Sequence, residues 1–201
     1  MLCWQRKNKP GIMFKIKYFI IFIFVFNVFA AAANAYEIAL ITYPDYNKNW
    51  KQIYRAKQYD ELLSQWIPSY EDDKKWTESV VFHSYKWAKG NSSYRFMSNL
   101  LANVLNRNST MRTQILKDRA EDSIAIWCAD KNQNMEAQCE ILRVTSSYEG
   151  LVSIHYINKN PKAFMEYQKD NWLPIIQNVR IYYSYFRWDR VNGKETSIQL
   201  Q

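Results

Sequence analysis

The chain contains two histidines, and their side chains have the pKa best suited to acid–base chemistry near neutral pH. His83 lies within the segment Val80–Tyr85, which is rich in β-forming residues. His155 lies within Leu151–Ile157, a segment of the same character. If these two predicted strands are neighbours in one sheet, the imidazoles can meet and an aspartate or glutamate can join them, as a hydrolase requires. A histidine in a strand is more commonly a half-buried structural residue, so a hydrolase using His83 or His155 is the third functional hypothesis.

Other patterns that carry chemistry are sparse. Glu71, Asp72 and Asp73 lie in a polar segment typical of a solvated turn, with acid–base catalysis or weak Ca²⁺ binding as the alternatives. The spacings of the serine-hydrolase elbow, the zinc proteases and the EF-hand do not occur. Phosphate-binding loops need clustered glycines, whereas the glycines that follow the N-terminal segment are isolated: Gly90, Gly150 and Gly193. The sequence therefore predicts a non-enzymatic protein with no metal and no cofactor.

Aromatic side chains make up 16% of the chain and are dense near its C-terminal end. Residues 179–188 form the strongest predicted strand, in which successive side chains point to opposite faces. If helices cover one face of this strand, the other face displays rings to a protein or a glycan. If both faces are covered, the rings belong to the core, and this alternative stays open. The candidate partner surface consists of Tyr182, Tyr183, Tyr185, Phe186 and Trp188.

Two cysteines, Cys128 and Cys139, lie outside the N-terminal segment. They belong to β-rich runs, 123–128 and 137–142, that flank a polar turn. A hairpin places the two cysteines nearly opposite each other, where the Cβ separation suits a disulfide. Closing a loop of this length stabilises a protein by roughly 2–3 kcal/mol in the chain-entropy model. A reactive thiol pair or a metal site is the alternative, but the spacing is not Cys-x-x-Cys, so we predict a structural disulfide.

The first 35 residues have the layout of an export signal. Two lysines precede an apolar run over residues 18–31, and Ala33-Asn34-Ala35 fits the small-x-small pattern of signal peptidase. Cleavage is therefore predicted between Ala35 and Tyr36, and Met13 is an alternative start. An uncleaved anchor is the competing interpretation, although the apolar run is shorter than the roughly 20 residues that a membrane span needs. Both interpretations place the folded part across the membrane, in the periplasm or outside the cell.

The formal net charge of +8 arises mainly from this N-terminal segment. Residues 1–35 contain five lysines and arginines and no acidic residue, so the remainder has a net charge of +3. In that remainder the two signs alternate along the chain, which is typical of a solvated surface rather than of a stripe that follows phosphates. We predict no nucleic-acid partner, and membrane contact only through an uncleaved signal segment.

Hydrophobic periodicity predicts strands at 37–44, 59–67, 80–85, 123–128, 137–142, 151–157 and 179–188. A helix beginning at Ser92 or Ser93 is predicted from apolar residues at helical spacing: Met97, Leu100, Leu101, Val104 and Leu105. A second helix runs from Pro161 toward Ile176, with Pro174 expected to kink or shorten it. Residues 51–67 are ambiguous, because Tyr54, Gln58, Leu62 and Trp66 have helical spacing, and only the last part, 59–67, is interpreted as a strand. Residues 110–120 are charged and weakly helical, either a long loop or an extra turn.

Runs of strands interrupted by two helices predict an α+β fold, a twisted antiparallel β-sheet with two main helices packed on it. In element order this fold resembles the PsbP-like α/β/α sandwich, a resemblance of topology that implies nothing about function. We predict a signal peptide over 1–35, a single α+β domain over 36–192 and a flexible tail over 193–201.

The leading functional hypothesis is an exported bacterial protein, periplasmic or secreted, that acts without catalysis. Its partner is then another envelope protein, and the chain is an accessory of an envelope or secretion assembly. The second hypothesis is a module that binds a glycan or a small apolar ligand through exposed aromatic side chains.

Overall fold

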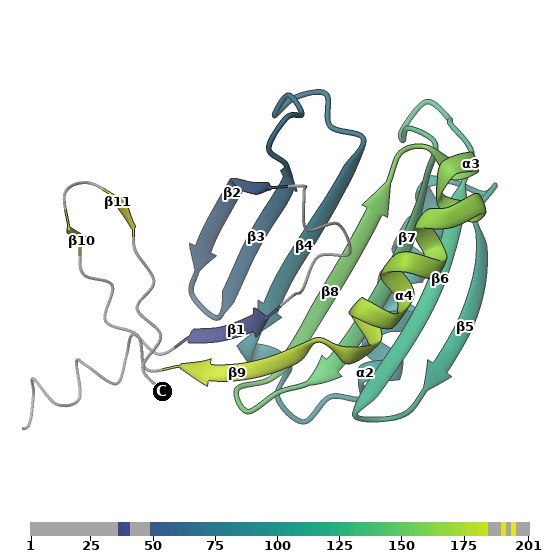
Figure 1. Ribbon diagram of the computed structural model, residues 1–201. Coiled ribbons are helices and arrows are strands. Elements are labelled where there is room, and N and C mark those ends of the chain that lie inside the picture. The colour runs from purple at the N-terminus through teal and green to yellow at the C-terminus, as the bar shows by residue number, and fades with distance from the viewer. Residues whose placement is uncertain (1–35, 41–48, 185–189, 192–193, 196–201) are drawn as a thin grey trace, which may run out of the picture. The chain divides into compact units, whose positions relative to one another are not determined.

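The computed structural model describes residues 36–40, 49–184, 190–191 and 194–195 (Figure 1). Residues Glu37–Tyr182 form one compact unit. The other unit, Met1–Tyr36 with Tyr183–Gln201, contributes the short hairpin of β10 (Arg190–Val191) and β11 (Lys194–Glu195). The predicted signal peptide lies outside the described residues. None of the described helices is both long enough and apolar enough to cross a membrane.

The larger unit is built on a seven-stranded antiparallel sheet. From one edge to the other, the strands are β2 (Trp50–Gln58), β3 (Glu61–Pro68), β4 (Glu78–Tyr85), β8 (Leu151–Asn158), β7 (Gln138–Ser146), β6 (Asp122–Ala129) and β5 (Arg112–Asp118). Neighbouring strands are consecutive in the chain except for β4 and β8, whose pairing joins two series of hairpins. This one long-range pairing brings the two histidine-bearing strands side by side.

Helices lie on both faces of this sheet (Figure 1). On one face, α2 (Ser93–Arg107) follows the short 3₁₀ turn η1 (Lys86–Ala88) and begins after Ser92, whose hydroxyl accepts a hydrogen bond from the Arg95 N–H at 3.5 Å. On the other face, α3 (Pro161–Ala163), the π-helical η2 (Phe164–Gln168) and α4 (Lys169–Asn178) follow one another without a break. Pro161 stands at the start, where its missing N–H costs no hydrogen bond. The helix continues through Pro174 to Asn178 rather than ending there.

The face under α4 holds the larger aromatic core. Tyr156 of β8 stacks on Trp172 of α4 with ring centroids 4.2 Å apart. Arg143 of β7 ties the helix end to the sheet, because its Nη1 donates to the carbonyls of Ile176 and Val179 at 3.0 and 2.8 Å. β1 (Tyr36–Leu40) pairs with β9 (Arg180–Ser184), and side chains from both strands pack against this same core.

The opposite face is only partly covered, because α2 packs on β6 and β7. Trp127 and Leu142 are buried there with Met97 of the helix. Leu63 of β3 and Val81 of β4 point to the same face and remain partly exposed. We call β6 and β7 on this face the covered half and β3 and β4 the open half, with β8 between them.

The predicted α+β class and the antiparallel sheet are confirmed, but the predicted element order is incomplete. The first part of the ambiguous segment 51–67 belongs to the edge strand β2, Trp50–Gln58. A register shift between Gln52 and Tyr54 interrupts the two-residue alternation there, which hides the strand pattern. The weakly helical assignment of residues 110–120 is wrong, because Arg112–Asp118 pairs with β6 as β5. An edge strand carries charged, exposed side chains, so its composition resembles that of a loop.

Candidate functional site

The register of β4 and β8 brings the two histidines onto one face of the sheet. His83 is opposite Ser153, and Val81 is opposite His155, so the two imidazoles are diagonal neighbours. Diagonal cross-strand residues lie about 7–8 Å apart, within reach of long side chains. The sequence analysis expected the imidazoles to meet only if these strands are neighbours, and they are. Each histidine also has a glutamate partner.

His155 is enclosed in a chain of buried polar groups. Its Nδ1 lies 2.7 Å from Glu140 Oε1, and its Nε2 lies 2.7 Å from Ser153 Oγ. The Tyr85 hydroxyl lies 3.4 Å beyond, next to the same serine oxygen, and burial raises the pKa of Tyr85 to about 12. Both ring nitrogens of His155 therefore have partners, and the Tyr85 hydroxyl stays neutral.

The order of atoms along this chain is that of a serine–histidine–acid triad. A nucleophile must touch its substrate, however, and Ser153 is 0% exposed. Glu140 is buried as well. As it stands, the arrangement is a closed polar network that links β4, β8 and β7 inside the fold.

His83 has a different environment in the open half. Its Nε2 lies 3.0 Å from Glu61 Oε2, and because a carboxylate only accepts, Nε2 carries the proton of the neutral ring. Burial lowers the pKa of His83 below its usual 6.5, against the opposing effect of Glu61. The imidazole is thus neutral at neutral pH and has its Nδ1 lone pair available. Within the described part of the chain, no donor bonds to that nitrogen.

Trp87 lies at the same carboxylate, on η1 just after β4. Its Nε1–H donates to Glu61 Oε1 at 2.8 Å. Its ring lies 6.0 Å from that of Tyr85, nearly perpendicular to it, and 5.8 Å from that of Phe96. The indole nevertheless remains 55% exposed. An exposed aromatic side chain is here held in one orientation by a hydrogen bond and two rings.

Three further exposed tyrosines belong to the segments at this end of the strands. Tyr59 is in the β2–β3 turn and is 90% exposed, with a φ of 46° that is unusual for a residue with a side chain. Tyr148 is in the β7–β8 turn beneath Lys89 Nζ, 5.3 Å from the ring centroid. Tyr94 is in the first turn of α2. We call Tyr59, Trp87, Tyr94 and Tyr148 the aromatic end.

A hydrogen bond, an ion pair and a close backbone approach join three segments of the aromatic end: η1, the β2–β3 turn and the β7–β8 turn. The Lys86 N–H donates to the Asp60 carbonyl at 2.8 Å, which joins η1 to the β2–β3 turn. The Lys86 ammonium pairs with Glu149 of the β7–β8 turn at 2.5 Å. A Cβ at Gly150 would lie 2.2 Å from the Tyr85 carbonyl oxygen, so only glycine permits this close approach. The aromatic end is therefore built on connected segments.

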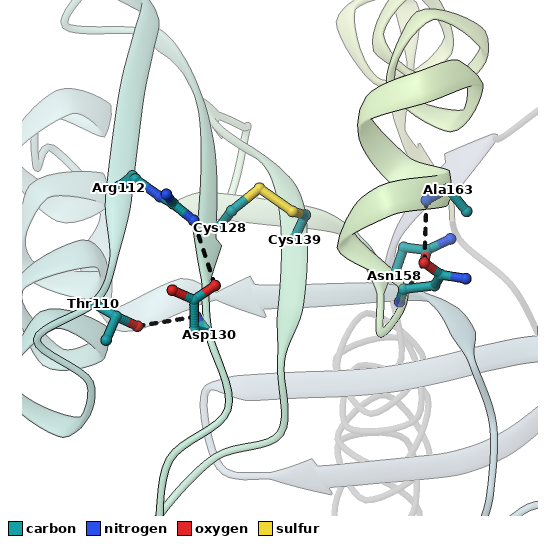
Figure 2. Close-up of a disulfide and its surroundings, with 8 residues drawn as sticks. Thr110, Arg112, Cys128, Asp130, Cys139, Asn158 and Ala163 are labelled. Atoms are coloured by element: carbon teal, nitrogen blue, oxygen red, sulfur yellow. Dashed lines mark hydrogen bonds and ion pairs between the residues drawn. A yellow bond between two sulfur atoms is a disulfide. The ribbon is translucent and has the colours of Figure 1, made fainter.

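The disulfide lies at the opposite end of the strands. Cys128 of β6 and Cys139 of β7 are directly paired, with Cα atoms 4.0 Å apart, and their sulfurs are joined (Figure 2). Nearby, the Asp130 N–H donates to Thr110 Oγ1 at 2.9 Å, which fastens the start of β5 to the hairpin. The disulfide predicted from the sequence is thus formed.

Each carboxylate of the acidic turn 71–73 is bonded to a neighbouring group. The carboxylate of Glu71 accepts from the Thr77 N–H at 2.8 Å, and Asp72 accepts from the Lys74 N–H at 2.8 Å. Asp73 pairs with Lys51 at 2.8 Å. In the portion of the chain that the structure describes, no group of three or more histidines, cysteines or carboxylates is arranged to hold a metal.

The partner surface predicted from the sequence is mostly untested. Tyr182 is half exposed, whereas the side chains of the other four members lie outside the described residues: Tyr183, Tyr185, Phe186 and Trp188. The predicted cleavage between Ala35 and Tyr36 also lies at the boundary of the described residues. Sequence reasoning found the two histidines but missed Glu61, Trp87, Glu140 and Ser153, because their roles depend on strand register.

The described residues thus define a class, an α+β fold with an antiparallel sheet, a helical segment on each face of the sheet and a disulfide between two neighbouring strands. Comparison of the chain with protein-family models, with curated proteins and with solved structures gives no match.

Proposed function

We propose that this protein is exported and acts without catalysis, by contact with another protein of the cell envelope through the aromatic end. The observation that carries the proposal is Trp87, which is 55% exposed yet fixed by Glu61 and two neighbouring rings. Protein interfaces are anchored by a few tryptophans, tyrosines and arginines. A ring that is already held in place loses little conformational entropy on binding.

Export is supported by the layout of the first 35 residues and by the Cys128–Cys139 pair, because disulfides persist in oxidising compartments. Fractionation of cells that express the full chain tests this step. The proposal expects a mature protein beginning at Tyr36 in the periplasm or medium. Intact chain in the cytosol, with both thiols reduced, would contradict it. We also propose that the topology is similar to that of the PsbP-like α/β/α sandwich. This similarity says nothing about the partner.

Photo-crosslinking in intact cells tests the contact surface. A photoreactive residue at position 59 or 148 is expected to capture one envelope protein, and Trp87→Ala is expected to abolish that capture. Tyr70→Ala is the matched control, because Tyr70 is 66% exposed and follows β3 at the other end of the strands. Capture that survives Trp87→Ala, or that is equally lost with Tyr70→Ala, would refute the proposed surface.

A hydrolase using His155 is the second candidate, favoured by the 2.7 Å contacts that run from Glu140 through His155 to Ser153. The complete burial of Ser153 opposes it. Labelling of the purified protein with a fluorophosphonate decides the matter. Stoichiometric labelling that is lost in Ser153→Ala would establish the hydrolase, and an unlabelled native protein excludes Ser153 as a nucleophile.

A glycan-binding module would use the same rings as the proposed protein interface. Titration of tryptophan fluorescence with cell-wall fragments separates the two. A saturable change that disappears in Trp87→Phe would favour the glycan.

A further inference from the structure

No positive charge of the described residues compensates the carboxylate of Glu61. It is 43% exposed, and its hydrogen-bond donors are the indole N–H of Trp87 and the imidazole of His83. The indole is neutral, and the lowered pKa of His83 keeps the imidazole neutral as well. No lysine or arginine in the described segments forms an ion pair with Glu61. The full negative charge is therefore presented to solvent beside an exposed aromatic ring.

Nearby cations are already engaged elsewhere. Lys86 pairs with Glu149, and Lys89 lies over the Tyr148 ring. Asp60, next to Glu61 in the chain, adds a second exposed carboxylate. Each oxygen of Glu61 accepts one hydrogen bond and keeps a second acceptor site, so the carboxylate can still accept a forked pair of donors.

We propose that Trp87, Glu61 and His83 form a subsite for an arginine side chain of the partner. The inference rests on the proposed protein-binding function and names the partner's chemistry. The guanidinium lies against the exposed indole and donates to both oxygens of Glu61. His83 fixes this carboxylate, because its Nε2–H donates to Glu61 Oε2 at 3.0 Å.

Arginine fits this subsite better than the alternatives do. A planar guanidinium stacks on an indole and matches a carboxylate with two parallel N–H groups, whereas lysine presents a compact, strongly hydrated charge. An anionic group is repelled by Glu61, and a neutral imidazole offers it no charge. A sugar ring can also stack on Trp87, but it gains nothing from an uncompensated carboxylate.

The test uses the purified protein and N-acetyl-arginine methylamide as the probe. The ¹H–¹⁵N signal of the Trp87 indole, identified by its absence in Trp87→Phe, reports binding directly. A saturable shift in the millimolar range is expected, and the citrulline analogue, which keeps the planar shape without the charge, is expected to bind about tenfold more weakly or worse. Glu61→Gln is expected to weaken arginine binding about 5- to 20-fold. Glu136→Gln, at an exposed carboxylate that pairs with Lys131, is the matched control and is expected to change nothing.

Equal shifts with arginine and citrulline, or arginine binding unchanged in Glu61→Gln, would overturn the subsite. A cell-wall disaccharide that shifts the indole signal when arginine does not would assign the site to a glycan instead. Crosslinking separates this inference from the proposed function. Partner capture that persists in Glu61→Gln refutes the subsite alone, whereas arginine binding without any capture refutes the protein-binding function alone.

Discussion

His83 and His155 lie on the same face of the sheet, on adjacent strands, and each contacts a glutamate, yet they belong to different kinds of site. Both nitrogens of His155 are bonded within a network whose serine and carboxylate are buried. His83 uses one nitrogen, and its glutamate is nearly half exposed beside an exposed tryptophan. The two imidazoles themselves are about equally exposed, at 19% for His83 and 17% for His155. The difference lies in their glutamate partners, since the side chain of Glu61 is 43% exposed and that of Glu140 is 7% exposed. The exposure of the glutamate partner therefore distinguishes the structural histidine from the one that lies beside a candidate binding surface.

The largest expected effect is on stability, in the buried network. His155→Ala leaves Glu140 buried without its partner and is expected to lower the free energy of unfolding by about 3 kcal/mol. His83→Ala, its matched control, is expected to lower it by about 1 kcal/mol or less, because Glu61 can turn to water. Urea unfolding of the two variants measures both values. Equal losses would mean that the environments of the two histidines do not differ in kind.

The next largest expected effect on the free energy of unfolding comes from removing the disulfide. Replacing Cys128 and Cys139 together with serine is expected to lower the free energy of unfolding by roughly 2–3 kcal/mol. Partner capture is expected to persist below the lowered melting temperature, because the disulfide and the aromatic end lie at opposite ends of the strands. Loss of capture while the variant is still folded would show that the two ends are coupled.

A smaller effect is expected at Tyr59, where the positive φ strains the turn. Tyr59→Gly is expected to raise the stability of the protein by about 1 kcal/mol, because glycine adopts this conformation without a steric penalty. The same change is expected to weaken partner capture, since it removes an exposed ring. Thermal unfolding and crosslinking of this one variant test both statements. A destabilised variant would contradict the strained turn, and unchanged capture would remove Tyr59 from the interface.

The smallest expected effect is on the pH dependence of stability. The pKa of His83 is lowered on folding, so between its folded value and 6.5 the unfolded chain binds more protons. Its contribution is complete above pH 6.5 and is lost as the pH falls below that value. The stability difference between the protein and His83→Gln is therefore expected to shrink between pH 7.5 and pH 5. Glu61, Tyr85 and His155 face this group and are kept in both proteins. A difference that does not change with pH would refute the buried, neutral imidazole.

Local sequence patterns predicted part of this fold correctly. Helical spacing identified α2, Pro161 marked the start of the second helical stretch, and the polar turn between the cysteines indicated their hairpin. The edge strands β2 and β5 were missed or left ambiguous, because a bulge interrupts one and charged, exposed side chains mask the other. Local composition does not distinguish such strands from loops.

Less of the candidate site could be predicted from the sequence. The two histidines were identified because histidine is a common acid–base residue. Their partners Glu61 and Glu140 follow from strand register, and β4 and β8 are far apart in the chain. The orientation of Trp87 depends on its contacts with Glu61, Tyr85 and Phe96, which come together only in the fold. No spacing in the sequence encodes either fact.

One variant tests the central claim, that the aromatic end binds a partner while the polar network around His155 stabilises the fold. For Trp87→Ala, the free energy of unfolding and the yield of crosslinked partner are measured in parallel. We expect unfolding within about 1 kcal/mol of the parent protein, because the ring is half exposed, together with loss of the crosslink. A folded Trp87→Ala that still captures the partner at the parental yield would contradict the account.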